Sequence, residues 1–405
     1  MHKILNMNNE TMKRFNASTV FKVIRENEPI SRKDIARITG LTSSSITNIV
    51  NRFMEKGYLE EVGLGTSCGG RKPIMLQLKA NAFYVIGVEL TTGYIMGIMT
   101  NLKAVKIYKD TVSINRKAGR QKIIDEMIAL IDRLIKNTGV PKNKIIGIGI
   151  AAPGPYDHVE GILVNPPNFP GWINVPIKSI IEKAFSIPVF LEKETVAAAL
   201  GEYWFGGAKD ARSLFVINSM KVGLGGGMLI DGKIYHGFKD GAGDVGHMTI
   251  DIDGPQCTCG GFGCLEALAS GLYMVSKAVS EIKRGAVTLL NDMISSIDEI
   301  TVDHIIKGAE QRDGLCMEII EKTARYLGIG LINIINIYSP DMIIIGGDLT
   351  IACPAYVEKA VMFARQHKYP RHNKDVKILP TSFGEEMACL GAISVVLQDF
   401  FNLEK

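Results

Sequence analysis

The feature that most constrains the fold is a pattern of strands followed by a helix, which occurs twice after about residue 83. The first occurrence has three strand-like segments, FYVIGVEL, YIMGIMTNL and AVKIYKDTVSI, then an amphipathic helix, RQKIIDEMIALIDRLIKN, and a buried strand, KIIGIGIAAPG. The second begins with SLFVINS and the glycine-rich hairpin VGLGGGMLIDGKIYHG, and ends with a buried helix and the strand MIIIGG. This alternation predicts an α/β fold of two similar lobes with a ligand cleft between them.

The first 80 residues have a different character from the rest of the chain. They hold 13 Lys and Arg against 7 Asp and Glu, a net charge of +6, so the remainder sums to −2. A basic segment ahead of a slightly acidic body is typical of a polyanion-binding module joined to another domain. Charge alone leaves a merely solvated surface equally open.

Helix signals in this basic segment define two consecutive helices. The stretch ETMKRFNASTVFKVIREN has apolar residues at helical spacing, namely Met12, Phe15, Val20, Phe21, Val23 and Ile24. Pro29 ends this helix, and Ser31 with Asp34 three residues later provides an N-terminal cap for the next one. The second helix is short because Gly40 terminates it.

A third helix, SSSITNIVNRFMEKG, follows Thr42, which can cap it. One face is an apolar stripe of Ile46, Ile49, Val50, Phe53 and Met54. The other face carries small hydrogen-bonding groups suited to base edges and phosphates, namely Ser43, Ser44, Thr47, Asn48, Asn51 and Arg52. Two short helices joined by a tight turn, the second polar outside, predict a helix-turn-helix.

Two strand-like runs around a glycine-rich turn, YLEEVGLGTSCGGRKPIMLQL, predict that the motif is winged. A plain three-helix bundle or a protein-docking module is the alternative, but helix pattern, polar face, wing and charge agree on DNA binding by residues 1–80. The predicted DNA contacts are Arg32, Thr42, Ser43, Ser44, Thr47, Asn48, Asn51 and Arg52, with Arg71 and Lys72 at the wing tip.

A histidine and three cysteines form the most specific chemical motif. His247, Cys257, Cys259 and Cys264 have the spacing H-x9-C-x-C-x4-C and are the ligand set of tetrahedral zinc. Four protein ligands leave no open position to activate water, so we expect a structural zinc rather than a catalytic one. Free cysteines on a glycine loop are the alternative. The odd total of seven cysteines, with no membrane span and no secretion signal in view, predicts a cytoplasmic protein.

The segment GAGDVGHMTIDIDGPQCTCGGFGCLE resembles the signature of the ROK family of repressors and sugar kinases. The resemblance covers nearly the whole chain, and the wing tip and the GHMT segment look like those of xylose repressors of Gram-positive bacteria. It implies a winged helix-turn-helix followed by a two-lobed, actin-like (ribonuclease H-like) sugar-kinase fold. The implied domains are 1–80, a first lobe 81–197 on which the C-terminal helix 385–405 packs, and a second lobe 198–384 with the zinc loop.

The resemblance also implies a sugar site. The family motif ENDA falls on EKET, residues 192–195, and the segment GExGH falls on GDVGH, residues 243–247. The residues implied to bind sugar are Asn168, Lys193, Glu194, Asp244, His247 and Glu266. Trp172, in the loop NPPNFPGW, is either a sugar-stacking residue or an ordinary core aromatic.

Kinase chemistry requires a placed base and a phosphate loop, and both positions are altered. Glu194 is at most a vestigial base, and the phosphate loop reads ELTTG, residues 89–93, where the family has DxGGT. We therefore expect no enzyme but a sugar-responsive repressor of carbohydrate-utilisation genes, responding to xylose or another aldose. An ATP-dependent sugar kinase with an added DNA-binding domain is the alternative, and control by a docking phosphotransferase protein is a third.

Lys193 stands where the family has asparagine, and two roles are open for it. It pairs with Glu192 or Glu194, or it meets an anionic ligand such as a sugar phosphate or a uronate. The expected partners are operator DNA, a sugar effector and a second copy of the chain, with a dimer of dimers as a further possibility and no membrane. The sequence leaves the direction of the sugar response open between induction and corepression.

Overall fold

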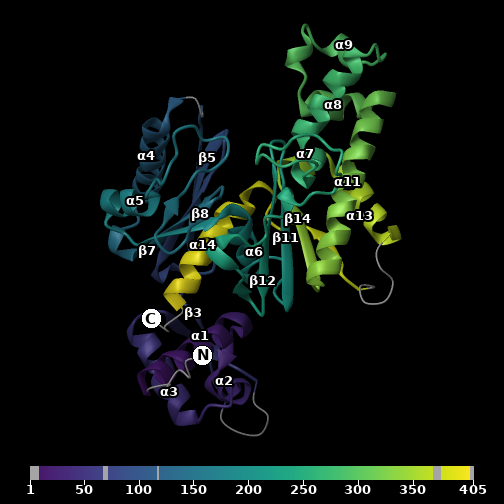
Figure 1. Ribbon diagram of the computed structural model, residues 1–405. Coiled ribbons are helices and arrows are strands. Elements are labelled where there is room, and N and C mark those ends of the chain that lie inside the picture. Colours follow the sequence, from purple (N-terminus) through teal and green to yellow (C-terminus); the bar gives the residue numbers. More distant parts are fainter. Residues whose placement is uncertain (1–8, 67–71, 116–117, 368–374, 402–405) are drawn as a thin grey trace.

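The computed structural model describes residues 9–66, 72–115, 118–367 and 375–401 of the chain, which form three units (Figure 1). A mainly helical N-terminal unit lies below two α/β lobes in Figure 1. Helix α14 (Met387–Phe401) runs between the lobes and ends near the N-terminal unit. Among the described residues no helix is long and apolar enough to cross a membrane.

The N-terminal unit is the predicted winged helix-turn-helix. Its elements are α1 (Asn9–Asn27), β1 (Ile30–Ser31), α2 (Arg32–Thr39), α3 (Ser43–Glu55), β2 (Leu59–Leu64) and β3 (Ile74–Leu78), with strand order β1-β3-β2. The caps are as predicted: Ser31 Oγ accepts the Asp34 N–H at 3.1 Å, and Thr42 Oγ1 accepts the Ser45 N–H at 3.3 Å. Gly40 ends α2 in the left-handed conformation, with φ 70°.

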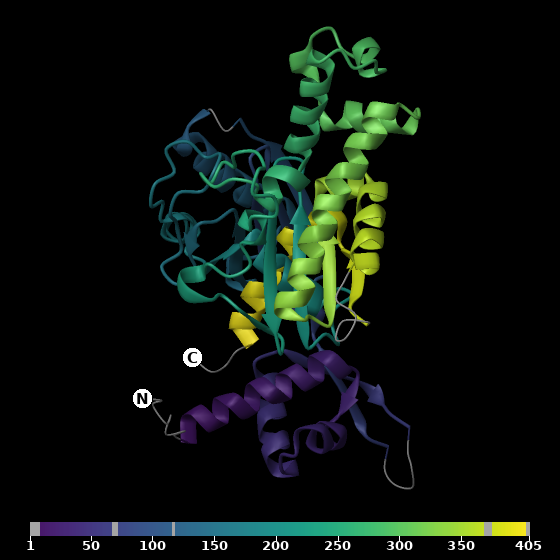
Figure 2. The ribbon, with the colours of Figure 1, turned by 45° about the vertical axis from the view of Figure 1, so that its right-hand side comes forward.

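Helical spacing does not lead to burial at the N-terminal end of α1. Met12 and Phe15, which belong to the apolar set of this helix, are 47% and 48% exposed. The buried face of α1 begins only at Ala17, because the N-terminal turns of the helix project beyond the other helices of the unit (Figure 2). In α3 the apolar stripe is buried from Ile46 to Phe53, as predicted.

The first lobe is a five-stranded sheet with strand order β10-β7-β4-β5-β6. Its elements are β4 (Tyr84–Leu90), β5 (Tyr94–Asn101), β6 (Lys106–Ser113), α4 (Arg120–Thr138), β7 (Ile145–Ala152), β8 (Tyr156–Asp157), β9 (Ile162–Leu163), α5 (Ile177–Phe185) and β10 (Val189–Lys193). Strands β4, β7 and β10 are parallel, whereas β4, β5 and β6 form an antiparallel meander. The parallel strands therefore bring residues 89–93 and 192–195 to the same edge of the sheet.

The second lobe has the strand order β13-β12-β11-β14-β15. Its elements are α6 (Glu194–Trp204), β11 (Ser213–Ser219), β12 (Leu224–Ile230), β13 (Lys233–Ile234), α7 (Leu265–Ala269), α8 (Gly271–Lys283), α9 (Leu290–Met293), α10 (Val302–Glu310), α11 (Gly314–Tyr338), β14 (Met342–Gly346), α12 (Asp348–Ala352), α13 (Pro354–His367) and β15 (Lys377–Pro380). Alternate residues of β11 face opposite layers: Leu214 and Val216 pack with α6, whereas Phe215 and Ile217 pack with α11.

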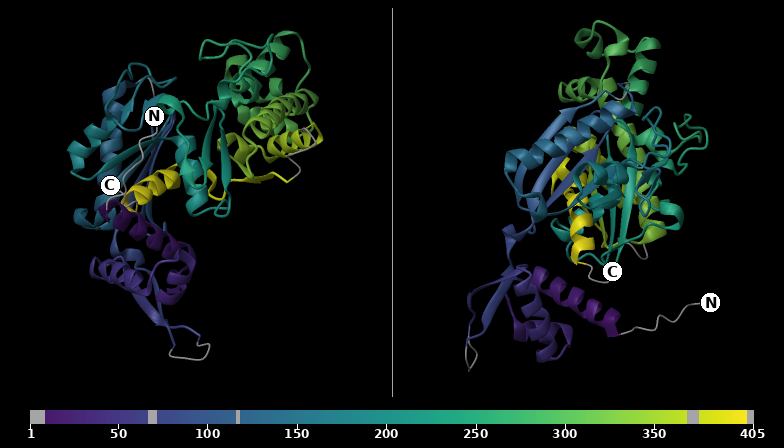
Figure 3. Two further views of the ribbon diagram at one scale, coloured as in Figure 1. Left: turned by 60° about the horizontal axis from the view of Figure 1, so that its bottom comes forward. Right: turned by 90° about the vertical axis from the view of Figure 1, so that its left-hand side faces the viewer.

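Helices α6 and α14 pack against each other between the two sheets (Figures 1 and 3). A Cβ atom on Gly391 of α14 would lie 2.2 Å from the Ala197 carbonyl of α6, so the two backbones can approach this closely only because residue 391 is glycine. Four alanines, Ala151, Ala197, Ala388 and Ala392, form the small core at this crossing. The lobes are thus joined through two closely packed helices, one on each sheet.

The N-terminal unit shares an apolar core with the first lobe and with α14. The Phe21 ring of α1 stacks on the Phe401 ring of α14, with centroids 3.8 Å apart. The Arg25 guanidinium lies 3.7 Å from the centroid of the Trp204 ring, at the end of α6. Both central helices therefore contact the helix-turn-helix unit directly.

Candidate functional site

The predicted DNA-contacting residues of α3 lie on its outer face. Thr42, Ser43, Ser44, Thr47, Asn48, Asn51 and Arg52 are all exposed, on the side of the helix opposite the buried stripe. Arg32 at the start of α2 is half-buried, and its guanidinium lies 3.5 Å from the Glu61 carboxylate of the wing. Lys72 is exposed and lines a shallow hollow with Arg32 and Lys33. Arg71 lies outside the described residues.

The four predicted metal ligands come together in the second lobe. One side-chain ligand atom from each of His247, Cys257, Cys259 and Cys264 lies within 4.8 Å of the others. Cys259 Sγ and Cys264 Sγ are 3.7 Å apart, and His247 Nδ1 is 3.8 Å from Cys257 Sγ. A tetrahedral zinc with bonds of about 2.3 Å to sulfur has sulfur–sulfur edges of about 3.8 Å, so this donor set fits the ion.

Glu266, two residues after Cys264 in α7, connects the Cys/His loop to the sheet of the second lobe. Its Oε2 atom accepts the backbone N–H of Leu224 at 3.0 Å, at the start of β12. Its Oε1 atom lies 3.9 Å from Cys257 Sγ. A metal ion that fixes the loop therefore also fixes the position of this carboxylate.

Lys193 makes an ion pair across the lobes. Its ammonium contacts the carboxylate of Asp244, and the lysine side chain is 8% exposed while that of Asp244 is 54% exposed. The partner differs from the expected Glu192 or Glu194, because Glu192 points to the opposite side of β10 and bonds Tyr156 and His236. The structure thus joins two predicted sugar-site residues, one from each lobe.

Glu194 begins α6 and is buried, with 9% of its surface exposed. Its Oε2 atom accepts no hydrogen bond from any residue that the structure describes. Burial raises the pKa of this carboxyl to about 7; the Lys193 charge acts in the opposite direction, whereas Asp244 and Glu266 add to the rise. A buried acceptor without a donor is costly unless a ligand supplies one.

Two residues of the loop NPPNFPGW behave differently. Asn168 is exposed and has φ 67°, a left-handed conformation that asparagine tolerates. Trp172 is 1% exposed and packs edge-on against Phe169, with ring centroids 5.3 Å apart. Trp172 is therefore a core aromatic of the first lobe and not a sugar-stacking residue.

The loop ELTTG is closed by its own threonine. Thr91 Oγ1 accepts the backbone N–H groups of Gly93 at 3.2 Å and Tyr94 at 3.0 Å, and it donates to the Tyr94 carbonyl. A phosphate loop directs free backbone N–H groups at its ligand, whereas these two N–H groups are already bonded within the loop and the following strand. Burial, with the charge of Glu194 nearby, raises the pKa of Glu89 to about 8.

Glycines of the second lobe allow close packing of backbones. Glycines 225–227 lie within β12, where a Cβ on Gly227 would be 2.4 Å from the Thr195 carbonyl of α6. Gly347 has φ 108° at the turn from β14 into α12.

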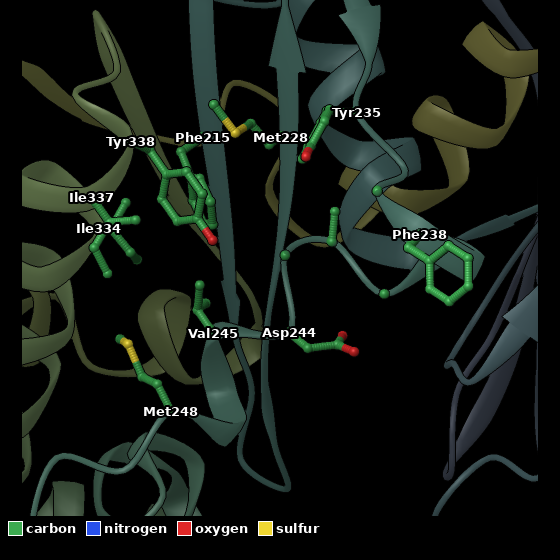
Figure 4. Close-up of a pocket in the computed structure, with 14 residues that line it drawn as sticks. Phe215, Met228, Tyr235, Phe238, Asp244, Val245, Met248, Ile334, Ile337 and Tyr338 are labelled. Atoms are coloured by element: carbon green, nitrogen blue, oxygen red, sulfur yellow. The ribbon is translucent and has the colours of Figure 1, made fainter. Parts of the chain in front are cut away.

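A cavity of about 510 Å³ opens on the second lobe beside Asp244 (Figure 4). Asp244 and Phe238 lie on one side of it, and Ile334, Ile337 and Tyr338 of α11 lie on the other. The residues that line it are mostly apolar and include several of the loop 235–245. Asp244, which pairs with Lys193, also lines this cavity.

These features define a DNA-binding regulator built on a sugar-kinase architecture: a winged helix-turn-helix, two lobes joined by two packed helices, a Cys₃His loop and a self-closed loop at the position of the phosphate loop. Residues 85–399 match the ROK family, and residues 15–65 match the MarR family. The chain belongs to the ROK family.

The similar proteins include regulators and kinases. The chain is 32% identical over 398 residues to the xylose repressor of Caldicellulosiruptor bescii, covering 98% of both chains. A ROK family transcriptional regulator, a homolog of the E. coli MLC protein, has a structure with a TM-score of 0.83 at 26% identity, covering 98% of this chain and 100% of that one. A ROK glucokinase from Streptomyces griseus, solved with glucose and AMPPNP, has a TM-score of 0.67 at 25% identity, covering 77% and 98%. The predicted fold class is confirmed.

Proposed function

We propose that this chain is a sugar-responsive transcriptional repressor of carbohydrate-utilisation genes and not an enzyme. The observation that carries the proposal is the combination of a closed phosphate loop with an intact buried acceptor. Thr91 already holds the loop N–H groups, whereas Glu194 Oε2 lacks a donor among the described residues. A site of this kind can bind a polyol without transferring a phosphoryl group to it.

The effector is a neutral aldose, with xylose as the first candidate, bound by Asn168, Lys193, Glu194, Asp244, His247 and Glu266. Lys193 is already paired with Asp244, so its charge is compensated within the site. Glu266 adds negative charge, and so does the ionised fraction of Glu194, whose pKa is raised to about 7; this charge disfavours a sugar phosphate or a uronate. The xylose repressors among the similar proteins support the same choice.

A structural zinc ion would be held by His247, Cys257, Cys259 and Cys264. When bound, it supplies no reaction chemistry, because four protein ligands fill a tetrahedral site. Its effect is to order the loop and so to hold His247 and Glu266 at the cleft. His247 Nδ1 faces the cysteines, which leaves Nε2 for a sugar hydroxyl.

The DNA-binding unit, residues 1–80, reads a pseudo-palindromic operator in the cytoplasm as part of a homodimer, which can pair further into a dimer of dimers. Sugar in the cleft between the first lobe (81–197 with helix 385–405) and the second lobe (198–384) changes the angle between α6 and α14. Both helices contact the unit through Trp204 and Phe401, so a change in their angle alters the spacing of the two recognition helices. Sugar then lowers the affinity for the operator by the factor by which it binds more tightly to the lobe geometry that fits DNA less well.

The test is operator binding by the purified chain, using DNA upstream of its own gene, with neutral pentoses and hexoses compared against their phosphates and uronates. Release by one neutral sugar supports the proposal, and release only by an anionic sugar would assign Lys193 to the ligand. Glu194→Gln is expected to bind operator normally but to lose the sugar response, whereas Glu318→Gln, on the exposed face of α11, should keep both.

The kinase alternative has the glucokinase likeness in its favour and predicts sugar-dependent ADP release. No operator binding together with ADP release would replace the repressor proposal with the kinase.

A further inference from the structure

Five side chains outside the predicted sugar site form a polar cluster between the lobes. Tyr156, His158 and Glu192 come from the first lobe, and His236 and Asp240 come from the second. His158 Nδ1 lies 2.7 Å from Asp240 Oδ1, and the His158 backbone N–H donates to Asp240 Oδ2 at 3.0 Å. In the opposite direction, His236 Nε2 lies 2.9 Å from Glu192 Oε2. Each lobe therefore contributes one histidine and one carboxylate.

The two imidazole rings stack, with centroids 4.0 Å apart and planes 7° apart. This geometry argues against a metal ion shared by the histidines, although His158, His236 and Asp240 lie close enough to suggest one. A metal lies in the plane of each imidazole that binds it, about 2.1 Å from the nitrogen. Two parallel rings about 4 Å apart cannot both meet that condition, so the cluster is held by hydrogen bonds and stacking.

Glu192 connects this cluster to the proposed effector site. It is 3% exposed and accepts hydrogen bonds from the Tyr156 hydroxyl, from His236 and from the backbone N–H of Lys193 at 2.9 Å. The next two residues of the chain are Lys193 and Glu194, both proposed to face the sugar. A shift of Glu192 therefore moves the first-lobe half of that site.

The second-lobe half is connected through a strained loop. Lys239 and Asp240 have φ values of 51° and 59°, which are left-handed conformations in residues other than glycine. Such strain persists only where surrounding contacts hold it, and here both oxygens of the Asp240 carboxylate bond His158 of the other lobe. The same loop contains a hydrogen bond from the Ala242 N–H to the His236 carbonyl at 2.9 Å. Asp244 of the proposed sugar site follows two residues after Ala242.

We propose that His158 and His236 are positioning residues that latch the two lobes together and align Lys193 and Glu194 with Asp244. This proposal depends on the proposed function in one respect: the residues that the latch aligns are those proposed to bind the sugar. The latch closes when each histidine crosses the cleft to the carboxylate of the other lobe, and opening the cleft breaks both bonds and releases the strained loop.

A dependence on pH follows from the groups around His236. Burial disfavours its charged form, but the hydrogen bond to Glu192 and the charges of Glu192 and Asp240 outweigh burial, so the pKa of His236 is raised. The first lobe presents Tyr156, His158 and Glu192 to this ring, and the second lobe presents Asp240. Protonated His236 therefore stabilises the closed latch fully below the ordinary histidine pKa of about 6.5. This stabilisation is lost as pH rises through the raised pKa of His236.

The experiment compares the full-length chain with His158→Ala, His236→Ala and His236→Gln, in which the glutamine amide can keep the bond to Glu192 without titrating. His367→Ala, at the exposed end of α13, is the matched control. Xylose affinity is measured by calorimetry at pH 6 and pH 8.5, and hydrogen–deuterium exchange of residues 235–244 is measured without sugar. We expect each alanine variant to bind xylose about tenfold more weakly at pH 6 and to exchange faster over 235–244. His236→Gln should bind better than the alanine variant and lose the part of the pH dependence that His236 causes.

Unchanged exchange over 235–244 in both alanine variants would overturn the latch, as would the same pH profile in His236→Gln and the wild-type chain. Glu194 also titrates near neutral pH, but it is present in every variant, so the comparison isolates His236. If the wild-type chain binds no neutral sugar, the effector assignment fails, and the exchange measurement, which needs no ligand, still decides on the latch.

Discussion

Replacing Glu194 by glutamine should separate the stability of this protein from its response to sugar. Burial raises the pKa of the Glu194 carboxyl from the ordinary 4.5 to about 7. Folding therefore takes up a proton on Glu194 between these pH values. The buried charge lowers the free energy of unfolding increasingly as pH rises from 4.5 to about 7, and by its full amount above this range. At 1.36 kcal/mol per pKa unit, that cost is about 3 kcal/mol at pH 8, about 1 kcal/mol at pH 5 and nearly absent at pH 4.

Glu194→Gln removes the charge and keeps the shape of the side chain. We expect its thermal midpoint to exceed that of the wild-type chain at pH 8, by an amount equivalent to about 1–3 kcal/mol, and to equal it at pH 4. The same change should weaken sugar binding tenfold or more, because a hydrogen bond to a charged acceptor contributes about 1.5–3 kcal/mol. Glu318→Gln is the matched control and should change neither quantity. Equal midpoints of Glu194→Gln and wild type at pH 8, or undiminished sugar binding, would refute the reasoning.

Three further predictions concern the metal, the DNA and the phosphate loop. Cys264→Ser should lower the zinc content, measured by elemental analysis, from one ion per chain to near zero and should lower the thermal midpoint; full zinc content in the variant would contradict the ligand set. Arg52→Ala should weaken operator binding about tenfold and reduce the slope of its salt dependence by about one, with sugar affinity unchanged in calorimetry. The wild-type chain should release no ADP in a coupled assay with sugar and ATP, because Thr91 closes the loop; turnover of about 1 per second or faster would refute this.

Local signals were strong enough to predict the helix-turn-helix and the metal loop. Ser31, Gly40 and Thr42 act within a few residues of their partners, so capping could be predicted without knowing the fold. The four metal ligands lie within 18 residues, and their spacing restricts them to one loop. Both predictions depend on short stretches of chain, where the sequence order already sets the distances.

The alternatives that the sequence left open were decided by contacts between distant segments. Trp172 had two interpretations, and its burial in the core of the first lobe against Phe169 decided between them. Lys193 pairs with Asp244 of the other lobe, a partner that the sequence did not suggest. Met12 and Phe15 have helical spacing, but only the packing of the unit determines where α1 leaves its neighbours.

The sequence by itself determined the elements, the winged motif, the Cys/His cluster and the family, because each depends on residues close together in the chain. The tertiary structure alone brought His158 to Asp240 and Glu192 to His236, pairs separated by 82 and 44 residues. No periodicity or spacing in the sequence predicts such a pair, because the contact depends on how the two lobes are oriented about the packed helices α6 and α14. The same closure leaves Glu194 buried with an acceptor atom unpartnered among the described residues, which is a property of the assembled cleft.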